Sequence, residues 1–358
     1  MNSTQRLSEL LLKNSSHEAA LIYYGNNRRY FTQFSSSEGA LLVTSTEAYL
    51  LMDFRYAEAA SKKAKNCKVL EFNSMASCLE KLLKVNGIKS VYLEQQHLTV
   101  SQANRFKSIC RAVDASVILN DSLDNAIRDI RIKKTPDEII KIEASQAITD
   151  AAFSHILSYI QPGLTEKEIA LELEFFMRKN GADSIAFELI VAAGKNSSMC
   201  HAVPSDYKVC NGDFITMDIG ALLDGYHSDM TRTVAVGGIT AKQQAVYDTV
   251  LKAHMAVIDA VKPGIPCSAI DKVARDIIEV NYPGRFGHAL GHGVGVEIHE
   301  EPRFAMSDST PCAPGMVVTD EPGIYLPNEF GVRIEDMLLI TEESCKSLTK
   351  SSKELICL

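Results

Sequence analysis

The chain lacks any hydrophobic run long enough to cross a membrane, and its first residues, MNSTQRLSELLLKNSS, contain no apolar stretch typical of a signal peptide. It also lacks an excess of basic residues: 37 lysines and arginines stand against 45 aspartates and glutamates, for a net charge of −8. A surface that binds nucleic acid needs a basic excess because it must neutralise phosphates. These absences argue against membrane and nucleic-acid partners and predict a soluble, cytoplasmic protein.

No C-x-x-C pair occurs among the nine cysteines, which stand at positions 67, 78, 110, 200, 210, 267, 312, 345 and 357. Zinc ribbons and thioredoxin-like redox sites are both built on such pairs. The cysteines are odd in number and scattered along the chain, so free thiols in a reducing cytosol are expected.

The chain is long enough for two domains. It has 358 residues, of which 46% are hydrophobic and 23% are charged, as in ordinary globular proteins. In its first part, short apolar runs at 40–44, 48–52, 90–93 and 116–119 alternate with helical segments. This alternation predicts a mixed α/β domain over residues 1–130.

A helix-start signal in the segment RIKKTPDE marks the boundary between the domains. Thr135 is suited to the N-cap, Pro136 to the first helical position and Glu138 to the third position of a capping box. A long amphipathic helix is therefore predicted to about Ile160. The second domain then covers residues 131–358.

The second domain contains a weak internal repeat. The Pro-Gly pair at 162–163 separates two predicted helices, and the Pro-Gly pair at 263–264 separates two more, 101 positions later. Each pair of helices leads to strands that carry two acidic residues. They are Asp218 and Asp229 in the first half and Glu321 and Glu335 in the second. We therefore predict an α+β domain of duplicated helix–helix–hairpin units around a shared central site.

The first acidic pair belongs to a predicted hairpin. If Asp224-Gly225 forms the turn, Asp229 lies opposite Gly220; if residues 223–224 form it, Asp229 lies opposite Asp218. Because side chains alternate along a strand, both registers place the two aspartates on one face. Two like charges in that position need a cation or a shared proton.

The second acidic pair and one histidine complete the candidate metal site. Pro322 interrupts strand pairing directly after Glu321, which suits a carboxylate turned into a site. Glycines flank His292 on both sides and allow a close approach of the backbone. Four carboxylates and one imidazole favour Mn²⁺ over a structural zinc site. Two such ions about 3.5–4 Å apart would share a water and supply hydroxide near neutral pH.

Each of these residues has an ordinary interpretation when it is taken alone. A single acid is more often solvated or salt-bridged than functional, and His288 and His292 have the spacing of an ordinary helical i,i+4 pair. The repetition of two acid-bearing hairpins around a glycine-flanked histidine is what supports a metal site.

Several segments resemble the pita-bread metallopeptidases, the family of aminopeptidase P, prolidase and methionine aminopeptidase. The matching segments are RIKKTPDEI, MDIGALLDGYHSDMTRT, GHALGHGVGVEIHEEPRF, VVTDEPGIY and GVRIEDMLLIT. The resemblance implies a pita-bread second domain whose metal-ligand positions all hold the expected residue type. Those positions are Asp218, Asp229, His292, Glu321 and Glu335. The first domain, with YYGNNRRYFTQF and LMDFRY, resembles the creatinase-like N-terminal domain of the proline-specific members.

The resemblance implies an Xaa-Pro aminopeptidase that removes the first residue of short peptides with proline second, using two divalent ions per chain. Mn²⁺ is the expected metal, with Co²⁺ and Zn²⁺ as alternatives, and the family implies a homodimer. Two other functions stay open: a prolidase restricted to dipeptides, and a non-catalytic pita-bread protein that binds a partner. The intact ligand set argues against the non-catalytic alternative.

The resemblance also assigns roles outside the ligand set. His201 is expected to contact the substrate, and His299 to bind it and stabilise the developing oxyanion. Glu321 is expected to be both ligand and proton shuttle, and Arg303 to hold a substrate carboxylate. A loop histidine and a surface arginine are the ordinary alternatives for His201 and Arg303. The residues expected to orient the ligands are Tyr226, Arg333 and Asp320.

The segment GVGVEIHE, residues 293–300, has the alternation of a short strand. In that strand Val294, Val296 and Ile298 would share one face and His299 would project from the other.

Overall fold

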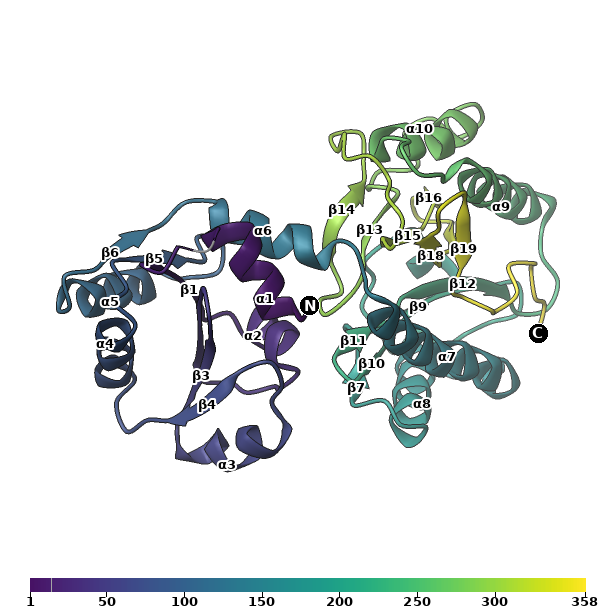
Figure 1. Ribbon diagram of the computed structural model, residues 1–358. Helices are drawn as coiled ribbons and strands as arrows, with labels where there is room; N and C mark the ends of the chain where they lie inside the picture. Colours follow the sequence, from purple (N-terminus) through teal and green to yellow (C-terminus); the bar gives the residue numbers. More distant parts are fainter. Residues whose placement is uncertain (14) are drawn as a thin grey trace. The chain divides into compact units, whose positions relative to one another are not determined.

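The computed structural model describes residues 1–13 and 15–358. The chain divides into two compact units, Met1–Arg131 and Ile132–Leu358 (Figure 1). Across the described residues, no helix combines the length and the apolar character that a membrane crossing requires.

The first unit is built on a six-stranded mixed sheet in the order β4-β3-β2-β1-β5-β6. Its strands are β1 (Glu18–Ile22), β2 (Ala40–Thr44), β3 (Ala48–Met52), β4 (Lys68–Glu71), β5 (Ser90–Leu93) and β6 (Ser116–Ile118). The pairs β1–β2 and β2–β3 are antiparallel, whereas β3–β4, β1–β5 and β5–β6 are parallel. The predicted α/β class is confirmed, and the four predicted strands are β2, β3, β5 and β6.

Helices pack on this sheet through apolar side chains. They are α1 (Ser3–Leu7), the π-helix η1 (Ser8–Leu12), α2 (Gly25–Thr32), α3 (Phe54–Lys63), α4 (Met75–Val85), α5 (Val100–Arg111) and α6 (Ser122–Arg131). Leu79 and Leu83 of α4 and Phe106 of α5 are buried in one cluster with Leu21 and Leu42 of the sheet. The sheet is thus covered by helices, as its apolar strands require.

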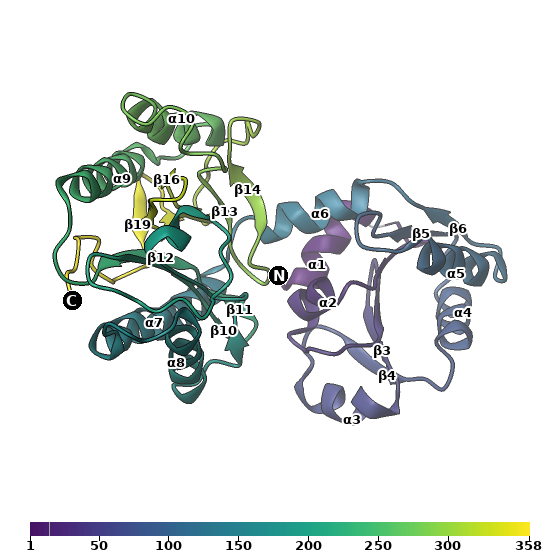
Figure 2. The ribbon, with the colours of Figure 1, turned by 180° about the vertical axis from the view of Figure 1, so that it is seen from behind.

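The second unit repeats one pattern twice, as predicted. One half has α7 (Pro136–Tyr159) and α8 (Glu166–Lys179), and the other has α9 (Ala241–Ala260) and α10 (Cys267–Ile278). Figures 1 and 2 show the two helix pairs on opposite sides of the strands. The capping box at the start of α7 is present, since Thr135 accepts from the backbone of Glu138 and Glu138 accepts from the backbone of Thr135.

The strands of the second unit form four small sheets, in the orders β12-β9-β8, β11-β10-β7, β14-β13-β15-β18-β19 and β16-β17. In the first half they are β7 (Ser184–Ile185), β8 (Ile190–Ala193), β9 (Phe214–Ile219), β10 (Ala221–Leu223), β11 (Tyr226–His227) and β12 (Met230–Ala235). In the second half they are β13 (Gly291–Gly293), β14 (Glu300–Phe304), β15 (Val317–Asp320), β16 (Gly323–Leu326), β17 (Phe330–Arg333), β18 (Asp336–Ile340) and β19 (Cys345–Ser347). The hairpins β9–β12 and β15–β18 are the two predicted acid-bearing units.

Apolar faces at helical spacing explain why each helix pair lies against its strands. In α8, Ile169, Leu173 and Met177 recur every four residues and are fully buried. They share a cluster with Ile215 and Met217 of β9. Since side chains alternate along β9, the apolar set on one face leaves the other face to polar residues.

The turn of the first hairpin selects one of the two predicted registers. Leu223 pairs with Tyr226, so Asp224 and Gly225 form the two-residue turn, with φ angles of 49° and 65°. Both residues therefore adopt the left-handed conformation of a type I′ turn. Asp229 then lies across from Gly220, two positions from Asp218.

One ordinary alternative is excluded and one local expectation is wrong. His292 lies in β13, so the alternative of a helical pair with His288 does not hold. Residues 295–299 form bends instead of the predicted strand. The reason is a tight turn, in which the N–H of Gly295 donates to the carbonyl of Glu297 at 3.0 Å and the N–H of Glu297 donates to the Glu300 carboxylate at 3.0 Å.

Candidate metal centre

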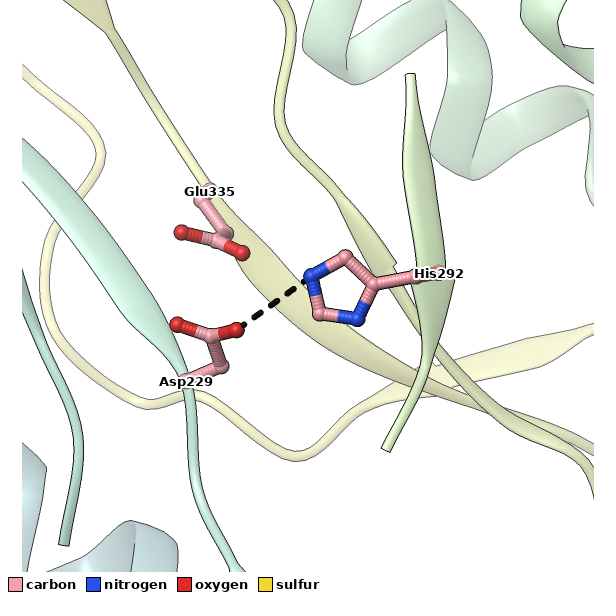
Figure 3. A group of neighbouring side chains, drawn as sticks. All are labelled: Asp229, His292 and Glu335. Atoms are coloured by element: carbon pink, nitrogen blue, oxygen red, sulfur yellow. Dashed lines mark ion pairs between the residues drawn. The ribbon is translucent and has the colours of Figure 1, made fainter. Parts of the chain in front are cut away.

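Three side chains from separate parts of the second unit converge on one point (Figure 3). Asp229 precedes β12, His292 is the middle residue of β13 and Glu335 precedes β18. Each offers one oxygen or nitrogen atom, and these atoms all lie within 4.8 Å of one another. The three residues are buried, with exposed fractions of 4%, 7% and 1%. A group of this size and composition could hold a metal ion.

Glu321 and Asp218 border this group. The Nε2 atom of His292 lies 3.4 Å from Oε1 of Glu321 and 3.5 Å from Oδ2 of Asp229. Asp218, on β9, accepts a hydrogen bond from Arg333 at 2.6 Å through Oδ2. Its other oxygen, Oδ1, is buried and has no hydrogen-bond partner within the described part of the chain. All five predicted ligand residues thus lie at this site, and an orphaned carboxylate oxygen is among their atoms.

The electrostatics of the site favour a bound cation. Burial, followed by repulsion from neighbouring carboxylates, raises the pKa of Asp229 and of Glu335 well above the usual range, and the same causes raise the pKa of Glu321 to about 8. Burial and the nearby His299 lower the pKa of His292 to about 3, so its imidazole is neutral. Ionised carboxylates at this density need a multivalent cation. The residues therefore fit the divalent metals that the sequence predicts.

Hydrogen bonds hold the carboxylates in place. The Thr231 hydroxyl donates to Oε2 of Glu335 at 2.7 Å and accepts from Nε of Arg333 at 3.0 Å. The Thr319 hydroxyl donates to Oε1 of Glu321 at 3.2 Å and accepts from the backbone N–H of His292 at 3.0 Å. The supporting role predicted for Arg333 fits these contacts. The two threonines were not predicted, although each lies two positions from a candidate ligand, on the same face of its strand.

A second polar chain leads from Arg333 away from the carboxylates. Its Nη1 donates to the hydroxyl of Tyr325 at 2.9 Å, and that hydroxyl lies 2.9 Å from Nε2 of His288. Nδ1 of His288 is 2.8 Å from the carbonyl of Ala289 and therefore carries the ring proton, so Nε2 accepts from Tyr325. Burial lowers the pKa of His288 to about 4, consistent with a neutral ring. Tyr325 was also missed; its only sequence signal is its place in VVTDEPGIY.

Two of the predicted supporting residues have other partners. Asp320 points to the opposite side of its strand from Glu321, and its Oδ2 lies 3.0 Å from Nδ1 of His254 on α9. The hydroxyl of Tyr226 donates to the carboxylate of Glu138 at 3.3 Å.

The three predicted substrate-contacting residues are exposed beside the buried cluster. The ring of His299 stands at 79° to that of His292, with 4.4 Å between centroids. Burial, followed by the nearby Arg303 guanidinium, lowers the pKa of His299. Arg303 lies across from His292 in the pairing of β13 with β14. An apolar hollow of about 560 Å³ borders His201 and is lined by Phe187 and Val203 among others.

This architecture and site define a two-domain pita-bread metallopeptidase. Residues 140–342 match metallopeptidase family M24, and residues 5–132 match the creatinase/prolidase N-terminal domain. The chain belongs to metallopeptidase family M24.

Relatives of known structure share the whole architecture. The Xaa-Pro dipeptidase from Bacillus anthracis is 40% identical, with a TM-score of 0.93 and 99% of each chain covered. The X-Pro aminopeptidase from Thermotoga maritima is 34% identical, with a TM-score of 0.89, 95% of this chain and 97% of that chain covered. By sequence, the Xaa-Pro dipeptidase of Pyrococcus horikoshii is 38% identical over 98% of both chains.

Proposed function

We propose that this chain is a dinuclear metallo-exopeptidase that hydrolyses the Xaa-Pro bond at the N-terminus of peptides. The observation that carries the proposal is the convergence of four carboxylates and one neutral imidazole at a buried point. The identity of the cleaved bond is inferred from the relatives named above. The dipeptidases and the aminopeptidase among them are all named for the Xaa-Pro bond.

The proposed ligands of two divalent ions are Asp218, Asp229, His292, Glu321 and Glu335, all in the proposed catalytic domain, residues 131–358. An oxygen-rich set with one imidazole favours Mn²⁺, with Co²⁺ and Zn²⁺ as alternatives. When bound, the metal pair supplies an activated water at neutral pH. The orphaned Oδ1 of Asp218 supports this assignment, because a buried carboxylate oxygen without a donor needs a cation.

Side chains of this chain are proposed to transfer the protons and to stabilise the negative charge that develops on the carbonyl oxygen. We propose that Glu321 takes a proton from the attacking water and passes it to the leaving nitrogen. That nitrogen needs a proton because the amide before proline carries no hydrogen. His299, beside His292, is proposed to donate to the oxygen of the scissile carbonyl, and His201, beside the apolar hollow, is proposed to contact the substrate.

A dipeptidase restricted to Xaa-Pro dipeptides is the second candidate. It is supported by the two relatives of highest identity named above, which are both Xaa-Pro dipeptidases. It is also supported by Arg303, which is exposed next to His292 and could bind the free carboxylate of a dipeptide bidentately.

The test is to incubate the same purified protein with Ala-Pro and with Ala-Pro-Ala and to measure the alanine that is released from each peptide. An aminopeptidase cleaves both peptides, whereas a dipeptidase cleaves only Ala-Pro. We expect no alanine from either peptide after chelation, and recovery on addition of Mn²⁺ or Co²⁺. Ala-Ala serves as the control without proline. Full activity in metal-free protein would contradict the dinuclear mechanism, and preference for Ala-Ala would contradict the substrate class.

We further propose a homodimer in the cytoplasm. The cytoplasmic location is supported by nine free thiols, and the dimer by family resemblance alone. Light scattering is expected to return twice the chain mass of 39.3 kDa. A mass near 39.3 kDa at working concentration would contradict the proposed dimer.

A further inference from the structure

Behind the metal centre, two aspartates face each other across neighbouring strands. Asp320 ends β15, Asp336 begins β18, and the two residues are directly paired in the antiparallel register. Both are fully buried. Like charges directly opposite in a sheet destabilise the pairing unless a cation lies between them.

That cation comes from α9. His254 is fully buried, and its Nδ1 lies 3.0 Å from Oδ2 of Asp320 while its Nε2 lies 3.6 Å from Oδ2 of Asp336. The imidazole therefore bridges the two strands. Burial alone would lower the pKa of His254, but the two carboxylates outweigh it and raise the pKa to about 9.

Each aspartate is the immediate chain neighbour of a proposed ligand. Glu321 follows Asp320 and Glu335 precedes Asp336, and neighbouring side chains along a strand point to opposite faces. The imidazole, on the face of the strands opposite to the proposed ligands, thus restrains the backbone beside Glu321 and Glu335. The two proposed ligands lie just beyond the paired residues of β15 and β18.

The two aspartates depend on His254 to different degrees. Asp336 also pairs with Arg232 at 2.8 Å and Lys353 at 2.7 Å, and accepts from Ser347 at 2.8 Å. Among the described residues, no well-aligned donor serves either oxygen of Asp320, and its ion pair with His254 is its largest favourable charge interaction. Loss of the imidazole would therefore leave Asp320 without an ion-pair partner among the described residues, whereas Asp336 would keep Arg232 and Lys353.

We propose that His254 is a positioning residue for the metal centre, which holds Glu321 in place through Asp320 and ties β15 to β18. The inference rests on the proposed function only in that Glu321 and Glu335 are taken as ligands. It requires no particular peptide substrate.

The experiment measures Mn²⁺ binding to metal-free protein by calorimetry and by electron paramagnetic resonance of the bound ions. The variants are His254→Gln, Asp320→Asn and the double variant. Loss of a residue behind a ligand typically costs 10–100-fold in metal affinity, and we expect each single variant to lose about that much. Both single variants remove the same ion pair between His254 and Asp320. We therefore expect the Mn²⁺ affinity of the double variant to be no lower than that of the single variant with the lower affinity.

The matched control is Val257→Ala, which removes buried apolar volume from the same helix without removing a charge. It should lower the melting temperature and leave Mn²⁺ affinity unchanged. Asp320→Asn nearly keeps the shape of the side chain, so the test stands even if His254→Gln fails to fold.

Wild-type affinity in Asp320→Asn or in folded His254→Gln, or losses that simply add in the double variant, would overturn the inference. Wild-type protein that binds two Mn²⁺ ions but cleaves no Xaa-Pro peptide would overturn the proposed function alone.

Discussion

Replacing Glu335 by alanine is expected to remove at least one metal ion and nearly all turnover, and Asp229→Ala should do the same. Glu335 is 1% exposed and is held by the Thr231 hydroxyl, so no other side chain substitutes for it. We expect kcat/KM to fall by about 10³ or more, roughly 4 kcal/mol of transition-state stabilisation.

The fold should survive both substitutions. Burial and neighbouring carboxylates raise the pKa of Asp229 and Glu335, so the removal of one carboxylate relieves repulsion in the metal-free protein. The hydrogen bond from the backbone N–H of Glu335 to the carbonyl of Thr231 does not involve the side chain, so it remains in the variant. Elemental analysis measures metal content, and circular dichroism checks the fold. The control is Glu342→Ala, an exposed carboxylate that should keep both ions. Two tightly held ions in either site variant would contradict the ligand assignment.

The second large effect is expected for His299→Ala, which should lower kcat by about 10²–10³, on the order of 3–4 kcal/mol, by analogy with single oxyanion donors. The ring is exposed and lies edge-on beside that of His292. Burial and the cationic Arg303 lower its pKa, so a neutral imidazole N–H is available at neutral pH. A donor that strengthens its bond as the carbonyl oxygen gains charge affects kcat more than KM.

Metal content separates this role from that of a ligand, because His299→Ala should keep both ions. The matched control is His155→Ala, since His155 of α7 stacks on Phe176 and pairs with Glu172, both on the neighbouring helix α8. That substitution should change stability and leave kcat near the wild-type value. A His299→Ala variant that loses metal, or that loses only substrate affinity at normal kcat, would show the assigned role to be wrong.

The parts of the fold that could be predicted from sequence are those set by local chemistry. The capping box at Thr135 and the Asp224-Gly225 turn are short-range patterns whose hydrogen bonds and φ angles involve only neighbouring residues. The place of Asp218 on β9 followed from alternation, because an apolar face buried against a helix leaves the other face polar. The strand predicted over 293–300 is interrupted at residues 295–299, where the Glu300 carboxylate accepts a hydrogen bond from the backbone N–H of Glu297.

Sequence by itself determined the class of site: four carboxylates, one glycine-flanked histidine and their repeated spacing. Tertiary structure alone decided which groups support them. Thr231 reaches Glu335 across 104 positions of the chain, and His254 on α9 meets Asp320 on β15. No periodicity connects such residues, because their contact depends on how helices and hairpins pack after each has formed. The residue types of the proposed metal site can therefore be predicted from local sequence, whereas the contacts that hold these residues in place are long-range hydrogen bonds and buried charge pairs.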